Sequence, residues 1–429
     1  MPFMAIQVSP IFAQSQSRIN LALMKRFTEL LPRFFLLVLP WVVLMGCAGR
    51  LPLGPIVKPA PTAIPSTPTP KPTAAVALTE VPTNRLKSLS KTVAITRWFW
   101  FPEGSSTAYW ENYMTDADLK LMNDMGVLGV RLVISPTFFY QVNAPTTLNP
   151  DMIGYLDKAV DRILAANLAV VIDMHDQDKS VWENNTQYVD GFMAFWQTLA
   201  RRYSNRDPDR VIFEFLNEPV FDNRADDWAK IQQRWVKAMR QVVPNHTFIV
   251  TGNGWGGIDG LQKLQPLSDK NLVYSYHFYD PMEFTHQGAT WAGPGLEPLK
   301  GLPYPATPER CKDLLAKTTD AGLKQHIKIF CYGYINASKL KNRIAEAADW
   351  GKANNVPLWM GEFGVYCPNA PTDDRAKWIA DVRKAAESFN IGWSVWGYDE
   401  CFGLQRKLLA DGKVKIDTDV AKALGLNVP

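Results

Sequence analysis

A tract of basic residues is missing from this sequence, although its formal net charge is +4. Residues 1–46 hold four basic residues and one acidic residue, a net of +3, which leaves a net of +1 for the rest of the chain. Nucleic-acid-binding proteins usually concentrate lysine and arginine on one face or along one helix. We therefore expect no nucleic-acid partner.

The common metal-binding patterns are also absent. There is no His-Glu-x-x-His, no paired Cys-x-x-Cys and no Asp-rich calcium loop, so we expect no metal and no other cofactor. Gly252–Gly257 does match the pattern G-x-G-x-x-G of dinucleotide-binding loops. However, we expect Gly260 and Pro266 to interrupt the following helix, and the next strand ends in His277 instead of an acidic residue, which argues against a nucleotide site.

The N-terminal region has no apolar run long enough to span a bilayer. Phe34–Met45 is short and follows Lys25 and Arg26, as in a signal peptide. It leads into Leu-Met-Gly-Cys47, which resembles a bacterial lipobox, where the cysteine becomes lipid-modified and forms the new N-terminus. We expect a signal over residues 1–46, with residues 1–23 arising from a start codon placed too early. A plain secretory signal or an uncleaved anchor is the alternative.

Proline and threonine dominate the segment that follows, so residues 47–87 are expected to be the lipidated cysteine and an extended tether. Residues 88–429 are then expected to form one catalytic domain. An extracytoplasmic location, on the cell surface or in the periplasm, follows from a lipid anchor; the alternative is a secreted protein. Cysteine is scarce, and four residues remain after Cys47, which permits two disulfides in three possible pairings.

Short β-rich apolar runs alternate with amphipathic helical patterns after the tether. Eight such pairs within roughly 340 residues are typical of an α/β protein with a (β/α)8 TIM barrel. An open, doubly wound sheet is the alternative. The expected strands are Val93–Trp98, Gly129–Ile134, Ala169–Asp173, Val211–Leu216, Phe248–Thr251, Leu272–His277, Pro357–Gly361 and Gly392–Trp396. The main expected helices are Thr115–Met125, Asp151–Asn167, Gly191–Tyr203, Asp226–Val242, Leu340–Asn354 and Asp373–Phe389.

Two of the expected strands end in glutamates. Val211–Leu216 is followed by Asn-Glu-Pro, in which the glutamate is Glu218, and Pro357–Gly361 is followed by Glu362. The residue before a proline avoids the helical region, so we expect Glu218 to be extended. Two carboxylates on two strand ends are the groups that glycoside cleavage requires.

Other polar residues occupy the same ends of the expected strands. Because active sites of such barrels lie at these ends, the residues should share one rim. They are Arg131, His175, Asn217, His277, Tyr279 and Trp396. Glu214 points into the barrel below this rim and is expected to be structural. His246, His286 and His326 receive no role.

This set of residues resembles glycoside hydrolase family 5, of the clan of retaining (β/α)8 barrels, over most of residues 90–400. The resemblance implies that Glu218 is the acid/base and Glu362 the nucleophile. It also implies that Arg131 pairs with the nucleophile, and that His175, Asn217, His277, Tyr279 and Trp396 shape the subsite at the cleaved bond.

Elementary chemistry agrees with these roles. An arginine beside Glu362 would lower the pKa of that carboxyl, and an apolar setting would keep Glu218 protonated. Asn217 can bond the sugar 2-hydroxyl, and Tyr279 can donate to the nucleophile. Trp396 offers a flat face to a pyranose ring.

The sequence has 15 tryptophans, and exposed ones can stack on sugars. Trp255 and Trp291 are candidates, as are Trp100 and Trp182, although core packing is an equal alternative for each.

The expected activity is a retaining endo-β-1,4-glucanase acting on cellulose-like or mixed-linkage glucan. The alternatives are a β-mannanase, a β-1,3-glucan hydrolase, or a non-catalytic glycan-binding surface lipoprotein. The expected partners are a polysaccharide or oligosaccharide and, through the anchor, a membrane, with the protein as a monomer.

The segment 280–356 departs from the family pattern and is expected to form a lid or wall over the cleft. Cys367 and Cys401 follow neighbouring expected strands, so we expect them to be bridged. Cys311 and Cys331 would then form the second bridge, within the insertion.

Overall fold

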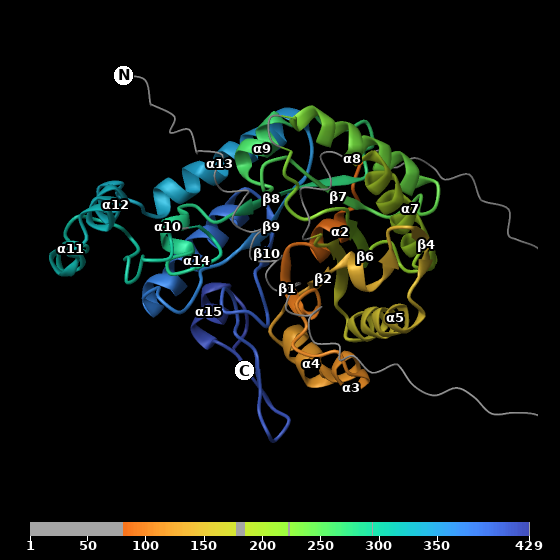
Figure 1. Ribbon diagram of the computed structural model, residues 1–429, viewed down its shortest axis with the longest axis horizontal. Coiled ribbons are helices and arrows are strands. Elements are labelled where there is room, and N and C mark those ends of the chain that lie inside the picture. Colours follow the sequence, from red (N-terminus) through yellow and green to blue (C-terminus); the bar gives the residue numbers. More distant parts are fainter. Residues whose placement is uncertain (1–79, 177–184, 222–223, 294, 429) are drawn as a thin grey trace, which may run out of the picture. The chain divides into compact units, whose positions relative to one another are not determined.

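Eight parallel strands close into a barrel, in the order β1-β10-β9-β8-β7-β6-β5-β2 (Figure 1). The computed structural model describes residues 80–176, 185–221, 224–293 and 295–428. The features below belong to the compact unit Lys71–Pro429. The closed parallel barrel, with helices between its strands, confirms the predicted fold class and excludes the open sheet.

All eight predicted strands are present, with ends that differ from the prediction by three residues or fewer. They are β1 (Lys91–Phe99), β2 (Gly129–Ile134), β5 (Ala169–Met174), β6 (Val211–Glu214), β7 (Phe248–Thr251), β8 (Leu272–Phe278), β9 (Leu358–Phe363) and β10 (Gly392–Val395). Two small hairpins, β3 (Tyr140–Gln141) with β4 (Ala144–Leu148) and β11 (Lys407–Leu408) with β12 (Val414–Lys415), lie outside the barrel sheet.

Helices follow the strands and cover the barrel, as their amphipathic patterns predicted. The longer ones are α4 (Asp116–Asp124), α5 (Pro150–Ala165), α7 (Thr186–Arg202), α8 (Ala225–Arg240), α12 (Ala321–Tyr332), α13 (Ala337–Asn354) and α14 (Thr372–Ser388). The shorter ones are α2 (Thr83–Ser88), α3 (Thr107–Asn112), α9 (Ile258–Lys263), α10 (Met282–Thr285), α11 (Lys312–Lys317) and α15 (Thr418–Ala423). Within the described residues, no helix has both the length and the apolar composition to span a membrane.

The domain begins earlier in the chain than the predicted boundary at residue 88. Helix α2 lies in the stretch assigned to the tether, yet its Arg85 is 4% exposed. Arg85 binds Asp209 at 2.9 Å and donates to Thr247 Oγ1 at 3.0 Å. Val81 and Leu89 join a buried cluster supplied by strands β5 to β9. Helix α2 has only 6 residues, so its apolar residues form no helical repeat that the sequence would reveal.

The segment 280–356 contains four helices, α10 to α13. Tyr366 N–H, after β9, donates to the carbonyl of Thr285 in α10 at 2.8 Å, so the start of the insertion is tied to the rim. Helices α11 and α12 lie instead at the edge of the domain in Figure 1. The predicted wall is therefore formed only by the first part of the insertion.

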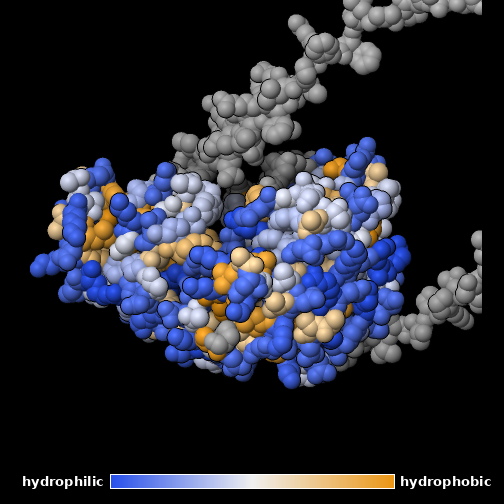
Figure 2. Space-filling model, turned by 90° about the horizontal axis from the view of Figure 1, so that it is seen from below, coloured by the Kyte–Doolittle hydropathy of each residue, from blue (hydrophilic) through white to orange (hydrophobic). Residues whose placement is uncertain are grey.

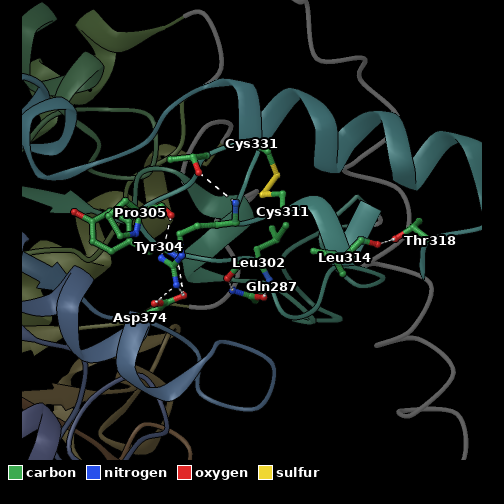
Figure 3. The surroundings of a disulfide bond; sticks show 11 residues. Gln287, Leu302, Tyr304, Pro305, Cys311, Leu314, Thr318, Cys331 and Asp374 are labelled. Carbon is green, nitrogen blue, oxygen red and sulfur yellow. Dashed lines mark hydrogen bonds and ion pairs between the residues drawn. A yellow bond between two sulfur atoms is a disulfide. The ribbon is translucent and has the colours of Figure 1, made fainter. Parts of the chain in front are cut away.

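Disulfides join the same cysteine pairs that strand order predicted, Cys311–Cys331 and Cys367–Cys401. The first ties α12 to the residue before α11 (Figure 3). Beside it, Tyr304 N–H donates to Asp374 at 2.9 Å, which fixes the loop between α10 and α11 against α14. The surface of the domain is mostly hydrophilic, with hydrophobic patches, and one of them lies at the α11–α12 end (Figure 2).

Candidate active site

Polar side chains from six strand ends meet at one rim of the barrel. Register brings them together: His277 pairs with Glu362 across β8 and β9, and Arg131 pairs with Val171 across β2 and β5. Beyond the end of β6, Asn217 N–H still donates to the carbonyl of Met174 on β5 at 2.8 Å. All eight site positions singled out from the sequence lie at this rim.

Glu362 is held by two donors. Arg131 Nη1 lies 2.5 Å from Glu362 Oε1, and the Tyr279 hydroxyl donates to Oε2 at 2.9 Å. Arg131 is fully buried, so its guanidinium has little freedom to move. Burial and the neighbouring carboxylates raise the pKa of Tyr279 well above its ordinary value, so its hydroxyl keeps the hydrogen that it donates. Charge-assisted hydrogen bonds of this kind hold a carboxylate in a defined orientation.

Glu218 does not have the extended backbone expected from the following proline. Its φ is +47°, in the left-handed region that non-glycine residues rarely adopt. The tertiary contacts outweigh the local preference, because His277 Nδ1 lies 3.0 Å from Glu218 Oε1. Strained backbone of this sort is concentrated at functional sites. The turn carries the Glu218 carboxyl to Glu362: the ligand atoms of Glu218, His277 and Glu362 all lie within 4.8 Å of one another.

Arg131 lies at the centre of the site and also holds the residues beneath it. Its Nε and Nη2 donate to the two oxygens of Glu214 at 2.8 and 2.9 Å. Nη2 also donates to Asn217 Oδ1 at 3.0 Å, which leaves the Asn217 amide NH2 as a donor for a ligand. Glu214 therefore has the structural position predicted for it, below the rim and paired with Arg131.

The two histidines of the site differ in charge. Burial alone would lower the pKa of His277, but Glu362 and Glu218 outweigh it and raise that pKa. Burial lowers the pKa of His175 well below its ordinary value, and the positive charge of Arg131 adds to the effect. His175 is therefore neutral near pH 7, whereas the carboxyls of Glu362 and Glu218 favour the charged form of His277.

Aromatic rings form one wall beside this cluster. The His175 ring stacks on Trp396, with centroids 5.5 Å apart and planes 12° apart. Trp100 meets both rings edge-on, at 4.7 Å from His175 and 5.6 Å from Trp396. Trp396 is thus positioned, as predicted, at the rim above Arg131, whose guanidinium is 5.9 Å from the Trp396 ring.

Trp255 is 58% exposed at the tip of the loop after β7. Its N–H and that of Gly254 donate to the carbonyl of Pro219, directly after Glu218, at 3.2 and 3.0 Å. The expectation that Gly260 interrupts the next helix was wrong, because α9 runs through it. A Cβ on Gly260 would lie 1.6 Å from the Asn253 carbonyl, so this glycine serves close packing.

Trp291, in the insertion, is 54% exposed and meets Tyr366 edge-on at 4.8 Å. Tyr366 contacts Phe402 at 5.3 Å, and Phe402 contacts Tyr279 at 6.0 Å. A continuous row of aromatic rings therefore links Trp291 to Tyr279, which donates to Glu362.

His286 is a neighbour of the site for which no role was predicted from the sequence. Its ring lies between Tyr279 and Phe402, with centroids 4.9 and 5.0 Å away. The Thr285 hydroxyl donates to the Tyr279 carbonyl at 2.6 Å, so it must accept from His286 Nδ1, 2.9 Å away. Burial lowers the pKa of His286 to about 4. No periodic signal marks it, because α10 is a single turn.

Glu218, His277 and Glu362 are near enough to share a metal ion. We assign none, because these groups are already hydrogen-bonded to one another and to Tyr279. Cys47, the tether before residue 80 and Trp182 lie outside the described residues.

Comparison with known proteins gives a family. The family model for cellulase (glycosyl hydrolase family 5) matches residues 95–400. Endoglucanase 3 of Fibrobacter succinogenes is 27% identical over 363 residues, which are 80% of this chain and 53% of that protein, about half its length. Endoglucanase C of Acetivibrio thermocellus is 26% identical, over 72% of this chain and 92% of its own.

A solved structure, Thermotoga maritima Cel5A in complex with cellobiose, is 25% identical with a TM-score of 0.64 and covers 80% of this chain and 99% of its own. The family match spans well over half of the chain and includes both glutamates of the rim. The chain therefore belongs to the cellulases of glycosyl hydrolase family 5 and is a glycoside hydrolase.

Proposed function

We propose that this enzyme is a retaining endo-β-1,4-glucanase that cleaves cellulose-like or mixed-linkage β-glucan. One observation carries the proposal: Glu218 and Glu362 bring carboxylate oxygens within 4.8 Å of each other. Retaining glycosidases hold their two carboxyls about 5–5.5 Å apart, whereas inverting enzymes leave roughly 6.5–9.5 Å for a water molecule.

In the first step, a Glu362 oxygen attacks the anomeric carbon while Glu218 gives its proton to the glycosidic oxygen, which leaves with the aglycone. In the second step, the Glu218 carboxylate takes a proton from water, and the water oxygen displaces Glu362. Arg131 and Tyr279 stabilise the carboxylate of Glu362 between turnovers. Asn217 has its amide NH2 available for the sugar 2-hydroxyl.

Substrate class is supported by the relatives. Two curated relatives bear the name endoglucanase, and the T. maritima enzyme has been solved with cellobiose. Exposed Trp255 and Trp291 offer further flat surfaces for a chain longer than one sugar. A β-mannan is the second candidate, because the same T. maritima enzyme has also been solved with a mannotriose substrate.

We further propose that the enzyme is a lipid-anchored, extracytoplasmic protein. The support is the lipobox-like Leu-Met-Gly-Cys47, the Pro/Thr-rich segment after it and the two disulfides, which are typical of oxidising compartments. The alternative is a secreted enzyme.

The test is a panel of β-1,4-glucan, mixed-linkage β-glucan, β-mannan and β-1,3-glucan, with the first product observed by proton NMR. We expect the highest kcat/KM on one of the two glucans with 1,4 linkages, and a β-anomer as the first product. An α-anomer formed first would exclude double displacement, and a preference for mannan would replace the glucanase assignment.

A further inference from the structure

Asp173 is a buried carboxyl that the mechanism above does not use. It lies on β5, two residues before His175, and its side chain is fully buried. Its Oδ2 contacts two groups: Arg131 Nη2 at 3.2 Å and His175 Nε2 at 2.6 Å. His175 Nε2 is also 3.9 Å from Glu362 Oε1, so Asp173 is one residue removed from the nucleophile.

The distance between Asp173 and His175 implies a shared proton. A carboxylate oxygen and an unprotonated ring nitrogen would present lone pairs to each other at 2.6 Å, which is repulsive. Neither Asp173 oxygen nor His175 Nε2 makes a hydrogen bond of acceptable angle within the described residues, so a proton between them is inferred from the 2.6 Å distance alone. The proton therefore belongs either to Asp173 Oδ2 or to His175 Nε2.

The position of this proton decides what His175 shows to a ligand. A neutral imidazole carries one N–H. Of the two ring nitrogens of His175, Nε2 is the buried one without an aligned hydrogen bond, so Nδ1 is the nitrogen left to face a ligand. We propose that Asp173 is a positioning residue that sets the tautomer of His175. When Asp173 is protonated, Nδ1 carries the hydrogen and donates to a substrate hydroxyl; when Asp173 is ionised, Nε2 carries it and Nδ1 accepts.

The charges around Asp173 place this change near neutral pH. Burial raises the pKa of Asp173 to about 7; Arg131 and His277 oppose the rise, and Glu362 and Glu218 add to it. Glu214, across β6, also faces the same guanidinium. One arginine thus serves three carboxyls, Asp173, Glu214 and Glu362, and the cluster keeps an extra proton more easily than three full negative charges.

The variant Asp173→Asn separates the two states. Arg131 can only donate, so the amide oxygen of the asparagine takes the place of Oδ2 and accepts from both Arg131 and His175 Nε2–H. The variant should therefore hold His175 in the Nε2–H tautomer at every pH. Asp118→Asn is the control, because it removes an equally buried aspartate that pairs with Arg406 on the outside of the barrel.

The tautomer is read by 15N NMR of histidine-labelled enzyme, with the His175 signal assigned by its loss in His175→Gln. In the wild type and in Asp118→Asn, we expect the hydrogen to move from Nδ1 to Nε2 as the pH rises through about 7. In Asp173→Asn it should stay on Nε2. A single tautomer throughout in the wild type, or an unchanged transition in Asp173→Asn, would overturn the proposal.

Kinetics gives a second readout. The pH profile of kcat/KM on the best substrate of the panel should lose one ionisation near pH 7 in Asp173→Asn and keep it in Asp118→Asn; an identical profile in both would contradict the proposal. This inference rests on the proposed function only for its kinetic part. If the glucanase assignment fails, the NMR result still stands or falls by itself.

Discussion

Each of the two glutamates at the rim has its own set of partners. Glu362 has Arg131 and Tyr279, two donors that stabilise negative charge, whereas Glu218 has His277 at 3.0 Å and a backbone φ of +47°. A nucleophile must be ionised and an acid must hold a proton, so the two environments suit different roles.

The variants Glu218→Gln and Glu362→Gln should separate those roles. Loss of the acid/base is expected to reduce kcat about 10²–10⁴-fold, and loss of the nucleophile by at least as much. With an aryl glycoside whose leaving group needs no proton, Glu218→Gln should recover a burst of released phenol, because its nucleophile is intact, and Glu362→Gln should not. Circular dichroism controls for folding. The roles would be reversed if Glu362→Gln gave the burst instead.

His246 bears on the stability of the fold, because it is a buried base at the end of the barrel far from the site. It lies near Arg85 and Arg240, both of its ring nitrogens are buried without partners, and burial lowers its pKa to about 4. An unfolded histidine has a pKa near 6.5. The unfolded chain therefore takes up a proton first, and stability falls as the pH drops from about 6.5 toward 4.

By linkage, the lowered pKa of His246 should reduce the free energy of unfolding by about 3 kcal/mol as the pH falls through this range. We expect the free energy of unfolding in urea to fall between pH 7 and about pH 4.5 by more in the wild type than in His246→Leu. Equal falls in the two proteins would show that other groups cause the acid sensitivity.

Among the elements, helix α2 makes contacts with several parts of the barrel although it has only 6 residues. Its single turn carries Arg85 to Asp209, Thr247 and Asn271, residues on three separate β–α units of the barrel. Val81 and Leu89 cover the apolar interior from the same side. The helix therefore closes the end of the barrel opposite the active site.

Truncation tests this element. A chain starting at residue 80 should keep the full stability. A chain starting at residue 89 should lose about 1–3 kcal/mol, because the buried oxygens of Thr247 and Asn271 lose the donor Arg85. Thermal unfolding followed by circular dichroism measures the difference, and Arg85→Ala isolates the ion pair. Equal stability of the two truncated chains would place the boundary at residue 88 after all.

The insertion behaves as two elements with different tasks. Its first part, with α10 and Trp291, joins the aromatic row that ends at Tyr279. Its second part, α11 and α12, is closed by the Cys311–Cys331 bridge at the edge of the domain. The spacing of apolar residues does not show where the first part of the insertion ends and the second begins. Contacts with other elements decide which part lies at the rim.

At the scale of the whole molecule, the location depends on the region before residue 80. The prediction is that Cys47 is lipidated and that the Pro/Thr-rich segment holds the barrel at a distance from the membrane. Cys47→Ser should release the enzyme into the medium or leave it unprocessed, with unchanged kcat/KM of the barrel. Labelling with a lipid precursor and cell fractionation measure this; a native protein that is unlabelled and wholly released would refute the anchor.

Local sequence patterns were enough to predict the barrel and to place Glu218 and Glu362 at the ends of two strands. Both depend on local patterns: apolar runs form strands, and a parallel barrel gathers the ends of its strands at one rim. The prediction from sequence was wrong about the backbone of Glu218 and about Gly260, where packing outweighed local preference.

Only the tertiary structure decided how the charges are shared. Arg131 meets Glu214 and Glu362 across 83 and 231 residues of sequence, and the pairing of β2 with β5 brings Asp173 to it as a third carboxyl. The same closure brings Arg85 from the expected tether into the domain. A single sequence shows which side chains a strand carries, but strand register and burial decide which of them touch and which must keep a proton.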